Sequence, residues 1–185
     1  MADSPLIVFG TSGGAAPLAV MRDALAVEGA PASLGVDIAG EATEAQLQDP
    51  SWEAAIVRWT EPELHEVLLI ERLPGDDEEA KRIVAAHREK IGAHDDEAGR
   101  MIVADTLSRV RTVYTVQLLP ALIAADGHEA WGALDALLRS VAREADALIY
   151  VEAEGYCDAD GELLLAEVDE PDDTVASEPG TSDVE

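Results

Sequence analysis

Two neighbouring segments rich in β-branched and aliphatic residues constrain the fold more than any other feature of the chain. Residues 54–60 and 65–73 each have the composition of a β-strand, and only residues 61–64, which include Pro62, separate them. Such a short connection can join antiparallel neighbours as a hairpin, whereas parallel neighbours need a crossover of about a dozen residues or more. The pair therefore predicts antiparallel sheet and argues against a purely parallel, doubly wound fold.

Further strands and helices are predicted on both sides of this hairpin. Apolar or alternating runs indicate strands at 5–9, 32–39, 109–118, 147–152 and 162–168. Apolar spacing and capping residues indicate helices at 17–29, 76–91, 95–107 and 126–145, with one helical turn at 43–47. Because helices and strands are interleaved without strict alternation, we expect an α+β fold: a mixed or antiparallel sheet with helices chiefly on one face, as a two-layer sandwich.

The helix expected at 126–145 has the clearest apolar face. Asp126 and Glu129 have the spacing of a capping box. The apolar residues that follow at helical spacing are Trp131, Leu134, Leu138, Val141 and Ala145. We expect this face to pack on the sheet with Trp131 mostly buried, so that Trp131→Ala costs about 3–5 kcal/mol. An exposed Trp131 would instead be a candidate anchor for a partner. In the helix expected at 95–107, the residues that share one face are Met101, Ala104 and Leu107.

The charge of the chain excludes two classes of partner. Its 185 residues include 39 Asp and Glu but only 12 Lys and Arg, which gives a formal net charge of −27. Phosphate binding needs a basic face, so the acidic balance argues against DNA or RNA as a direct partner. It argues equally against docking on an anionic membrane, and no apolar run approaches the roughly 18 residues of a spanning helix.

Length and composition also predict the domain organisation. The length is typical of one domain, and a hydrophobic content of 48% suffices for a core. Residues 169–185 contain seven acidic residues and no basic or aromatic residue. We therefore expect a single α+β domain at 1–168 and a disordered acidic tail at 169–185 that is dispensable for folding.

Two further features bear on the compartment. The single cysteine, Cys157, cannot form an intramolecular disulfide, which is typical of cytosolic proteins. The first five residues, MADSP, lack the basic n-region of a signal peptide. We expect a cytoplasmic protein.

The kind of charge favours a protein adapted to high salt. Ten of the 12 basic residues are arginine, alanine is abundant, and acidic residues are spread along the chain. In molar salt the Debye length falls to about 3 Å, which removes most of the self-repulsion of so acidic a globule. This composition resembles that of cytosolic proteins of salt-accumulating halophiles. The alternative is the codon bias of a high-GC mesophile, which also favours Ala, Arg, Asp and Glu.

A glycine-rich loop after the first predicted strand is the leading candidate site. Its residues are Gly10, Thr11, Ser12, Gly13 and Gly14. They fit the G-x-S-x-G pattern of a nucleophile elbow, in which a serine occupies a strained turn between a strand and a helix. Asp105 and His128 follow Ser12 in the order of such a triad. However, Pro17 suits the first helical turn and lies several residues beyond Ser12, whereas an elbow runs almost directly into its helix. The competing interpretations are a catalytic Ser12 and a flexible connection.

The same loop has a second functional interpretation. Backbone N–H groups before a helix N-terminus can bind phosphate or carboxylate. The loop lacks both G-x-G-x-x-G and the Lys-Ser or Lys-Thr of a P-loop, so neither nucleotide fingerprint is met. The five residues 10–14 are therefore candidate ligand-binding residues for an unspecified anion, and we expect no cofactor.

Two groups of residues superficially resemble metal sites. Four residues match positions of an EF-hand loop: Asp158, Asp160, Gly161 and Glu167. However, Tyr156 occupies the first position and the flanks are strand-like, so a hairpin turn is favoured. His87 and His94 lie near two aspartates, which is equally the pattern of a solvated helix end. We expect no metal site.

These observations favour a non-enzymatic cytosolic domain that acts through a protein-binding or small-ligand-binding surface. Each candidate catalytic set lacks a needed partner group. The alternative is a serine hydrolase built on Ser12. The two hypotheses differ in one observable, because a fluorophosphonate probe would label a catalytic Ser12 and the label would be lost in Ser12→Ala.

Overall fold

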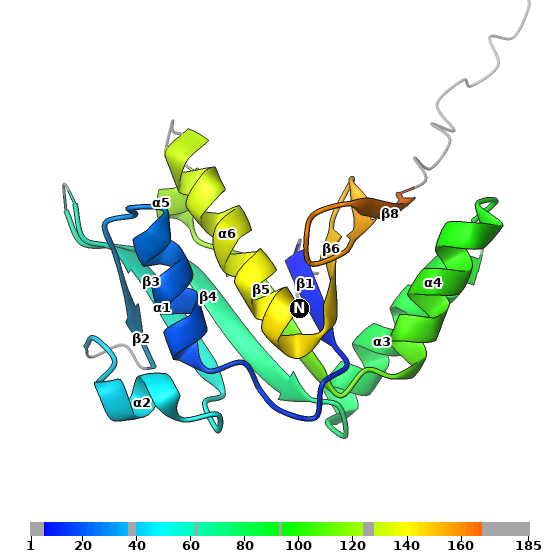
Figure 1. The fold of residues 1–185 in the computed structure, drawn as a ribbon, viewed down its shortest axis with the longest axis horizontal. Helices are drawn as coiled ribbons and strands as arrows, with labels where there is room; N and C mark the ends of the chain where they lie inside the picture. Colours follow the sequence, from blue (N-terminus) through cyan, green and yellow to red (C-terminus); the bar gives the residue numbers. More distant parts are fainter. Residues whose placement is uncertain (1–5, 37–39, 62, 93, 124–127, 168–185) are drawn as a thin grey trace, which may run out of the picture.

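The computed structural model describes residues 6–36, 40–61, 63–92, 94–123 and 128–167 (Figure 1). Its strands are β1 (Leu6–Gly10), β2 (Ala32–Gly35), β3 (Ala54–Trp59), β4 (His65–Pro74), β5 (Thr112–Leu118), β6 (Ala147–Val151), β7 (Gly155–Cys157) and β8 (Leu163–Ala166). Its helices are α1 (Leu18–Val27), α2 (Glu44–Gln48), α3 (Glu78–Gly92), α4 (Glu97–Ser108), α5 (Pro120–Ile123) and α6 (His128–Ala145). None of these helices, within the ranges given, has the length and apolar character needed to cross a membrane. The predicted tail at 169–185 and the expected cap at Asp126 lie outside the described residues.

The eight strands form one antiparallel sheet. Their order is β2-β3-β4-β5-β1-β6-β7-β8, and every neighbouring pair runs antiparallel. The hairpin expected from the sequence is the β3–β4 pair, which contains a register shift between Val57 and Arg58. The first strand, β1, lies between β5 and β6, which come from the second half of the chain. The N-terminal segment is thus an interior strand of the sheet.

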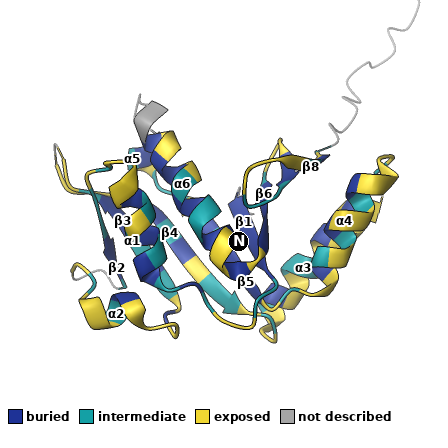
Figure 2. Cartoon of the chain, in the orientation of Figure 1, coloured by how far each residue is buried: buried dark blue, intermediate teal, exposed yellow. Residues whose placement is uncertain are grey.

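Helices cover both faces of the sheet, but unequally (Figures 1 and 2). On one face, α1, α2, α5 and α6 bury apolar residues against the sheet, among them Met21, Leu47, Leu122 and Leu137. On the other face, the α3–α4 pair packs over β1, β6, β7 and β8. The expected α+β fold with helices chiefly on one face is confirmed. The α3–α4 pair adds a third layer at one end, so the two-layer description holds for the other end only.

Strand β1 contributes to both cores. Leu6 and Val8 lie in the core beneath α1 and α6, whereas Ile7 and Phe9 lie in the core beneath α3 and α4. Successive side chains of a strand point to opposite faces, so a strand covered on both faces needs apolar residues at every position. This is why β1 has an unbroken apolar sequence.

Aspartate side chains fix the start of two helices. Asp96 Oδ1 accepts hydrogen bonds of 3.1 Å from the backbone N–H groups of Ala98 and Gly99 at the start of α4. Asp77 Oδ1 accepts a hydrogen bond of 2.8 Å from the backbone N–H of Glu79 at the start of α3. Each bond satisfies a backbone donor that has no partner inside its helix. The helices expected from residues 76 and 95 thus begin at Glu78 and Glu97, each directly after its capping aspartate.

The buried face of α4 differs from the expected one. Gly99, Val103 and Leu107 are buried, whereas Met101 is 65% exposed, so the face shared by Met101, Ala104 and Leu107 is not the buried face. The helix lies so close to β8 that a Cβ atom at Gly99 would clash with the backbone of Leu164. The spacing of apolar side chains does not show that a glycine contacts the sheet, so it does not identify the buried face of α4.

The expectation for Trp131 is also wrong. Its side chain is 44% exposed, whereas the rest of the predicted stripe on α6 is buried. The buried face of α6 includes Ala130, Ala133 and Leu137, and this places Trp131 at the margin of the face. Small residues at 130 and 133 let the helix approach the sheet, so the core is filled without the indole.

The short strand β7 has no counterpart in the predicted elements. It pairs with β6 and β8 through the residues Gly155, Tyr156 and Cys157. Gly155 has a positive φ of 118°, and a Cβ atom there would clash with the backbone of Leu165. Three residues are too few for an alternating pattern to be recognised.

The position of Trp131 gives a testable prediction. We expect Leu137→Ala, at a fully buried position of α6, to cost about 2–5 kcal/mol in the free energy of unfolding. Trp131→Ala should cost less than Leu137→Ala, because much of its side chain stays in water in the folded state. Urea denaturation of both variants measures the difference. A larger loss for Trp131→Ala would contradict the placement of the indole.

Candidate functional site

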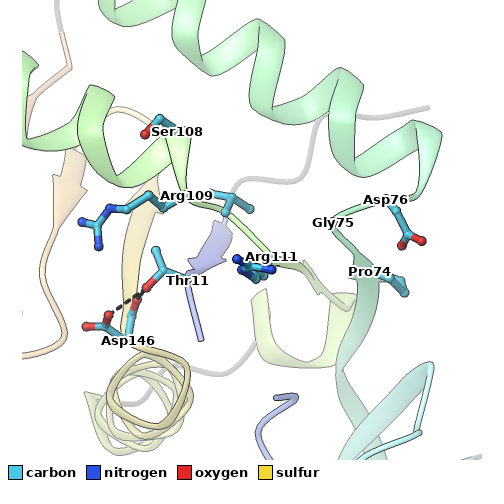
Figure 3. Close-up of a pocket in the computed structure, with 9 residues that line it drawn as sticks. Thr11, Pro74, Gly75, Asp76, Ser108, Arg109, Arg111 and Asp146 are labelled. Carbon is cyan, nitrogen blue, oxygen red and sulfur yellow. Dashed lines mark hydrogen bonds between the residues drawn. The ribbon is translucent and has the colours of Figure 1, made fainter. Parts of the chain in front are cut away.

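A cavity opens where the ends of four strands meet. Gly10, the last residue of β1, pairs with Thr112 at the start of β5 and with Ala147 at the start of β6. On the far side of β5, Thr112 pairs with Pro74 at the end of β4. The cavity has a volume of about 660 Å³ (Figure 3). The residues that line it are Thr11, Pro74, Gly75, Asp76, Ser108, Arg109, Val110, Arg111 and Asp146.

The backbone of Arg111 is held on two sides in this cavity. Its N–H donates a 2.8 Å hydrogen bond to Gly10 O, and its carbonyl accepts a 2.7 Å hydrogen bond from Gly75 N. A Cβ atom at Gly75 would lie 2.7–2.9 Å from the Arg111 backbone, so this position has no room for a larger residue. Arg111 is therefore fixed to the ends of β1 and β4.

The side chain of Arg111 is exposed and makes no hydrogen bond or ion pair to any residue that the structure describes. The other eleven lysines and arginines all have such a partner among those residues. One of them, Arg109, also lines the cavity but is paired with Asp105 at 2.8 Å. A planar guanidinium without a partner can bind a carboxylate or phosphate through two parallel hydrogen bonds.

Asp146 is held on the other side of Thr11. The Thr11 hydroxyl lies 2.8 Å from both the main-chain oxygen and Oδ2 of Asp146, and it donates its one hydrogen within this pair of contacts (Figure 3). Asp146 follows the last residue of α6 and has a positive φ of 47°, a conformation that aspartate tolerates better than most residues. The carboxylate makes no ion pair within the described ranges.

A second hollow of about 350 Å³ adjoins the first. The two share Thr11, Arg109 and Asp146. The second hollow contains Arg143, which is paired with Asp160 at 3.0 Å. Both arginines of the second hollow are already paired, so it has no unpaired arginine to bind an anion, whereas the first hollow has Arg111.

Of the loop at 10–14, only Thr11 lines the cavity. Gly10 lies beneath α6, where a Cβ atom would meet Ala145 Cβ at 3.0 Å, and Thr11 lines the cavity. Ser12, Gly13 and Gly14 do not line either hollow. The backbone N–H groups of Thr11 and Ser12 both donate to Ala145 O, at 3.0 and 2.9 Å. These two donors are therefore already occupied by the chain itself.

The structure describes no catalytic partner for Ser12 within the ranges given above. Its hydroxyl donates to Gly14 O at 3.1 Å, and α1 begins only at Leu18. Asp105, one possible member of a triad, is paired with Arg109. The side chain of His128 lies outside the described residues. The hydrolase interpretation of Ser12 stays a prediction.

The turn at 158–161 has the geometry of a hairpin rather than of an EF-hand. It joins β7 to β8, and Gly161 has a positive φ of 80°. Asp158 Oδ1 accepts hydrogen bonds from the backbone N–H groups of Asp160 and Glu162, at 2.8 and 2.9 Å. Its carboxylate thus shapes the turn. Within the described ranges, no group of three or more His, Cys, Asp or Glu residues could hold a metal ion.

A buried polar network on the other face of the sheet is not foreshadowed by the sequence. His87, expected near a solvated helix end, is only 9% exposed, and its Nδ1 shares a 2.7 Å hydrogen bond with the Tyr156 hydroxyl. Lys90 donates to the Tyr150 hydroxyl at 2.7 Å and pairs with Glu167. These residues come from α3, β6, β7 and the end of β8, which the sequence separates widely. The sequence does not predict that these tyrosine and histidine side chains contact one another, because they lie far apart along the chain.

The environment of this network shifts the pKa values of Lys90, Tyr156 and Glu167, and burial raises the pKa of Tyr150 too. Burial is the main reason that the pKa of Tyr156 lies well above its usual value. Burial alone would raise the pKa of Glu167, but hydrogen bonds from Lys90 and Tyr150 outweigh it and lower that pKa. Burial likewise opposes, but does not prevent, a raised pKa for Lys90. The network therefore keeps Lys90 and Glu167 charged, and we assign it a role in joining α3 to the sheet.

Comparison of the chain with protein-family models, with curated proteins and with solved structures finds no match.

The contact between Gly75 and Arg111 gives a prediction about the site. We expect Gly75→Ala to cost about 1–3 kcal/mol in the free energy of unfolding, because the added methyl group overpacks the Arg111 backbone. The matched control is Gly132→Ala in α6, where nothing lies within 4 Å of the added Cβ. This control should stabilise the protein by about 0.5–1 kcal/mol. Equal urea midpoints for Gly75→Ala and the parent protein would contradict the close contact.

Proposed function

We propose that the protein is a binding module that takes a small ligand into the cavity at the ends of β1, β4, β5 and β6. The observation that carries this proposal is Arg111, a cation with a fixed backbone and no side-chain partner among the described residues. In a chain of net charge −27, where carboxylates are abundant, a lining arginine that binds none of the described ones is available to a ligand. Pockets that bind small molecules commonly combine a concave surface with a few fixed polar groups.

The competing serine hydrolase has less support. A serine nucleophile needs a base within hydrogen-bond reach, and the described contact of the Ser12 hydroxyl is Gly14 O. Labelling by a fluorophosphonate, lost in Ser12→Ala, would establish the hydrolase and overturn the binding module.

The proposed site is tested by blocking the cavity. We expect compounds from a fragment library of carboxylates, amines, zwitterions and neutral molecules to shift the backbone amide NMR signals of Thr11, Gly75 and Arg111. Ser108→Trp should abolish these shifts, because Ser108 is an exposed residue of the lining and a tryptophan there fills the space. Gln48→Trp, an exposed position on α2, is the control and should leave them unchanged. Shifts that persist in Ser108→Trp, or an absence of shifts with every fragment, would refute the site.

We also propose that the protein works in the cytosol of a cell with high internal salt. A net charge of −27 spread along the chain supports this, because self-repulsion is greater in the compact state than in the unfolded chain. The seven charges of residues 169–185 account for only part of it, and −20 remains on residues 1–168. The alternative of codon bias predicts no dependence on such a medium.

A salt series separates these two origins of the acidity. We expect the melting temperature of the full chain to rise with KCl and to gain most of its increase by about 1 M, where the Debye length is about 3 Å. Potassium sulfate at matched ionic strength is the control, since any extra gain there reports stronger apolar burial. A melting temperature that stays flat from dilute buffer to molar KCl would leave codon bias as the explanation.

A further inference from the structure

An unpaired positive charge and an unpaired negative charge line the same cavity. The Arg111 guanidinium and the Asp146 carboxylate each lack an ion pair within the part of the chain that the structure describes. The third and fourth charges of the lining are Arg109, which is paired with Asp105, and Asp76. Asp76 likewise makes no ion pair within the described ranges, but no hydrogen bond holds its carboxylate, whereas the Thr11 hydroxyl lies 2.8 Å from Oδ2 of Asp146. Arg111 and Asp146 are therefore the two charges that the site holds in place without an ion pair.

The sheet keeps these two groups apart. Gly10 pairs with Thr112 on one side and with Ala147 on the other, so Arg111 and Asp146 each precede a residue that flanks β1. Adjacent strands lie about 4.8 Å apart, so the two backbones are separated by about 10 Å. Thr11 stands between them and bonds to Asp146 (Figure 3). Arg111 and Asp146 thus reach the cavity from opposite sides of Thr11, and both are available to a ligand that carries two charges.

The charge of the whole protein selects among ligands. A net charge of −27 repels small anions and, more strongly, polyanions such as nucleotides. The formal charges of the four charged lining residues cancel, which suits a ligand that is itself neutral overall but carries both charges.

We propose that the cavity binds a small zwitterion with an aliphatic chain between its charges. Its carboxylate takes two parallel hydrogen bonds from the Arg111 guanidinium, and its ammonium group faces the Asp146 carboxylate. This inference rests on the proposed binding function and adds the chemical class of the ligand.

The test compares three compounds of similar size on the full chain. The probes are β-alanine, which carries both charges, propionate, which carries only the carboxylate, and propylamine, which carries only the amine. We expect β-alanine to bind with a dissociation constant about tenfold lower than either single-charge probe, as one charge-assisted contact predicts. Binding is measured from the backbone amide NMR signals of Thr11, Gly75 and Arg111.

Variants assign each charge of the ligand to its partner. Arg111→Gln should raise the dissociation constant of β-alanine about tenfold and abolish the binding of propionate. Asp146→Asn should raise the dissociation constant of β-alanine about tenfold but leave that of propionate unchanged. Asparagine keeps the backbone conformation because it too tolerates positive φ. Arg22→Gln, at an arginine on α1 that is paired with Glu44, is the control and should change neither.

The outcomes separate this inference from the proposed function. If propionate binds as tightly as β-alanine and Asp146→Asn has no effect, the cavity is a simple anion site and the zwitterion is refuted, while the binding module stands. If propylamine binds as tightly as β-alanine, the zwitterion is refuted in the same way. If no probe and no fragment shifts the cavity signals, the binding module itself is refuted and this inference fails with it.

Discussion

The structure depends on the hydrogen-bonded pairing of β1 with β5 on one side and with β6 on the other. This pairing places β1 between two strands from the second half of the chain. Leu6 and Val8 of β1 then pack in the core on one face of the sheet, and Ile7 and Phe9 pack in the core on the other face. The register also places the end of β1 at Gly10 beside the starts of β5 and β6. The cavity lies at that place, so the same ladder that closes the core creates the candidate site.

Charge is distributed in a way that separates this site from the rest of the surface. Eleven of the twelve basic side chains have partners among the described residues, as expected when cations are scarce and carboxylates abundant. Three of these side chains, Arg72, Arg88 and Arg100, donate to main-chain oxygens, and the others form ion pairs with carboxylates. Where such an ion pair is exposed, it contributes little to stability, typically about 0–1 kcal/mol. Arg111 differs because the short contacts of its backbone with Gly10 and Gly75 fix where its side chain begins. The exposed side chain still loses rotational freedom when it binds an anion, at a cost of about 0.5–1.5 kcal/mol.

Much of the fold could be predicted from the sequence, because local signals determined it. Composition and the short connection at 61–64 identified the β3–β4 hairpin, and the helices expected from residues 76 and 95 begin within two residues of those positions. The wrong predictions of buried faces occur where small residues, rather than large apolar ones, determine how a helix packs. Gly99 shifted the buried face of α4 away from Met101, and Ala130 and Ala133 let α6 pack without Trp131.

The candidate site was predicted only in part. The loop at 10–14 was identified from its glycines, and of its residues Thr11 lines the cavity. Arg111 and Asp146 were not identified, because their importance comes from the pairing of Gly10 with Thr112 and Ala147 across the sheet. The same is true of the network of His87, Tyr156 and Lys90. The spacing of residues along the chain does not predict contacts that depend on the order of strands in the sheet.

The measurement that tests this account most directly is the ¹H–¹⁵N NMR spectrum of the arginine Nε–Hε groups, with the Arg111 signal assigned through Arg111→Gln. During a titration with β-alanine, the account predicts that the Arg111 signal moves while the signals of the paired Arg22 and Arg143 stay in place. An Arg111 signal that does not respond, while the other arginine signals do, would contradict the claim that this one unpaired guanidinium is the centre of the site.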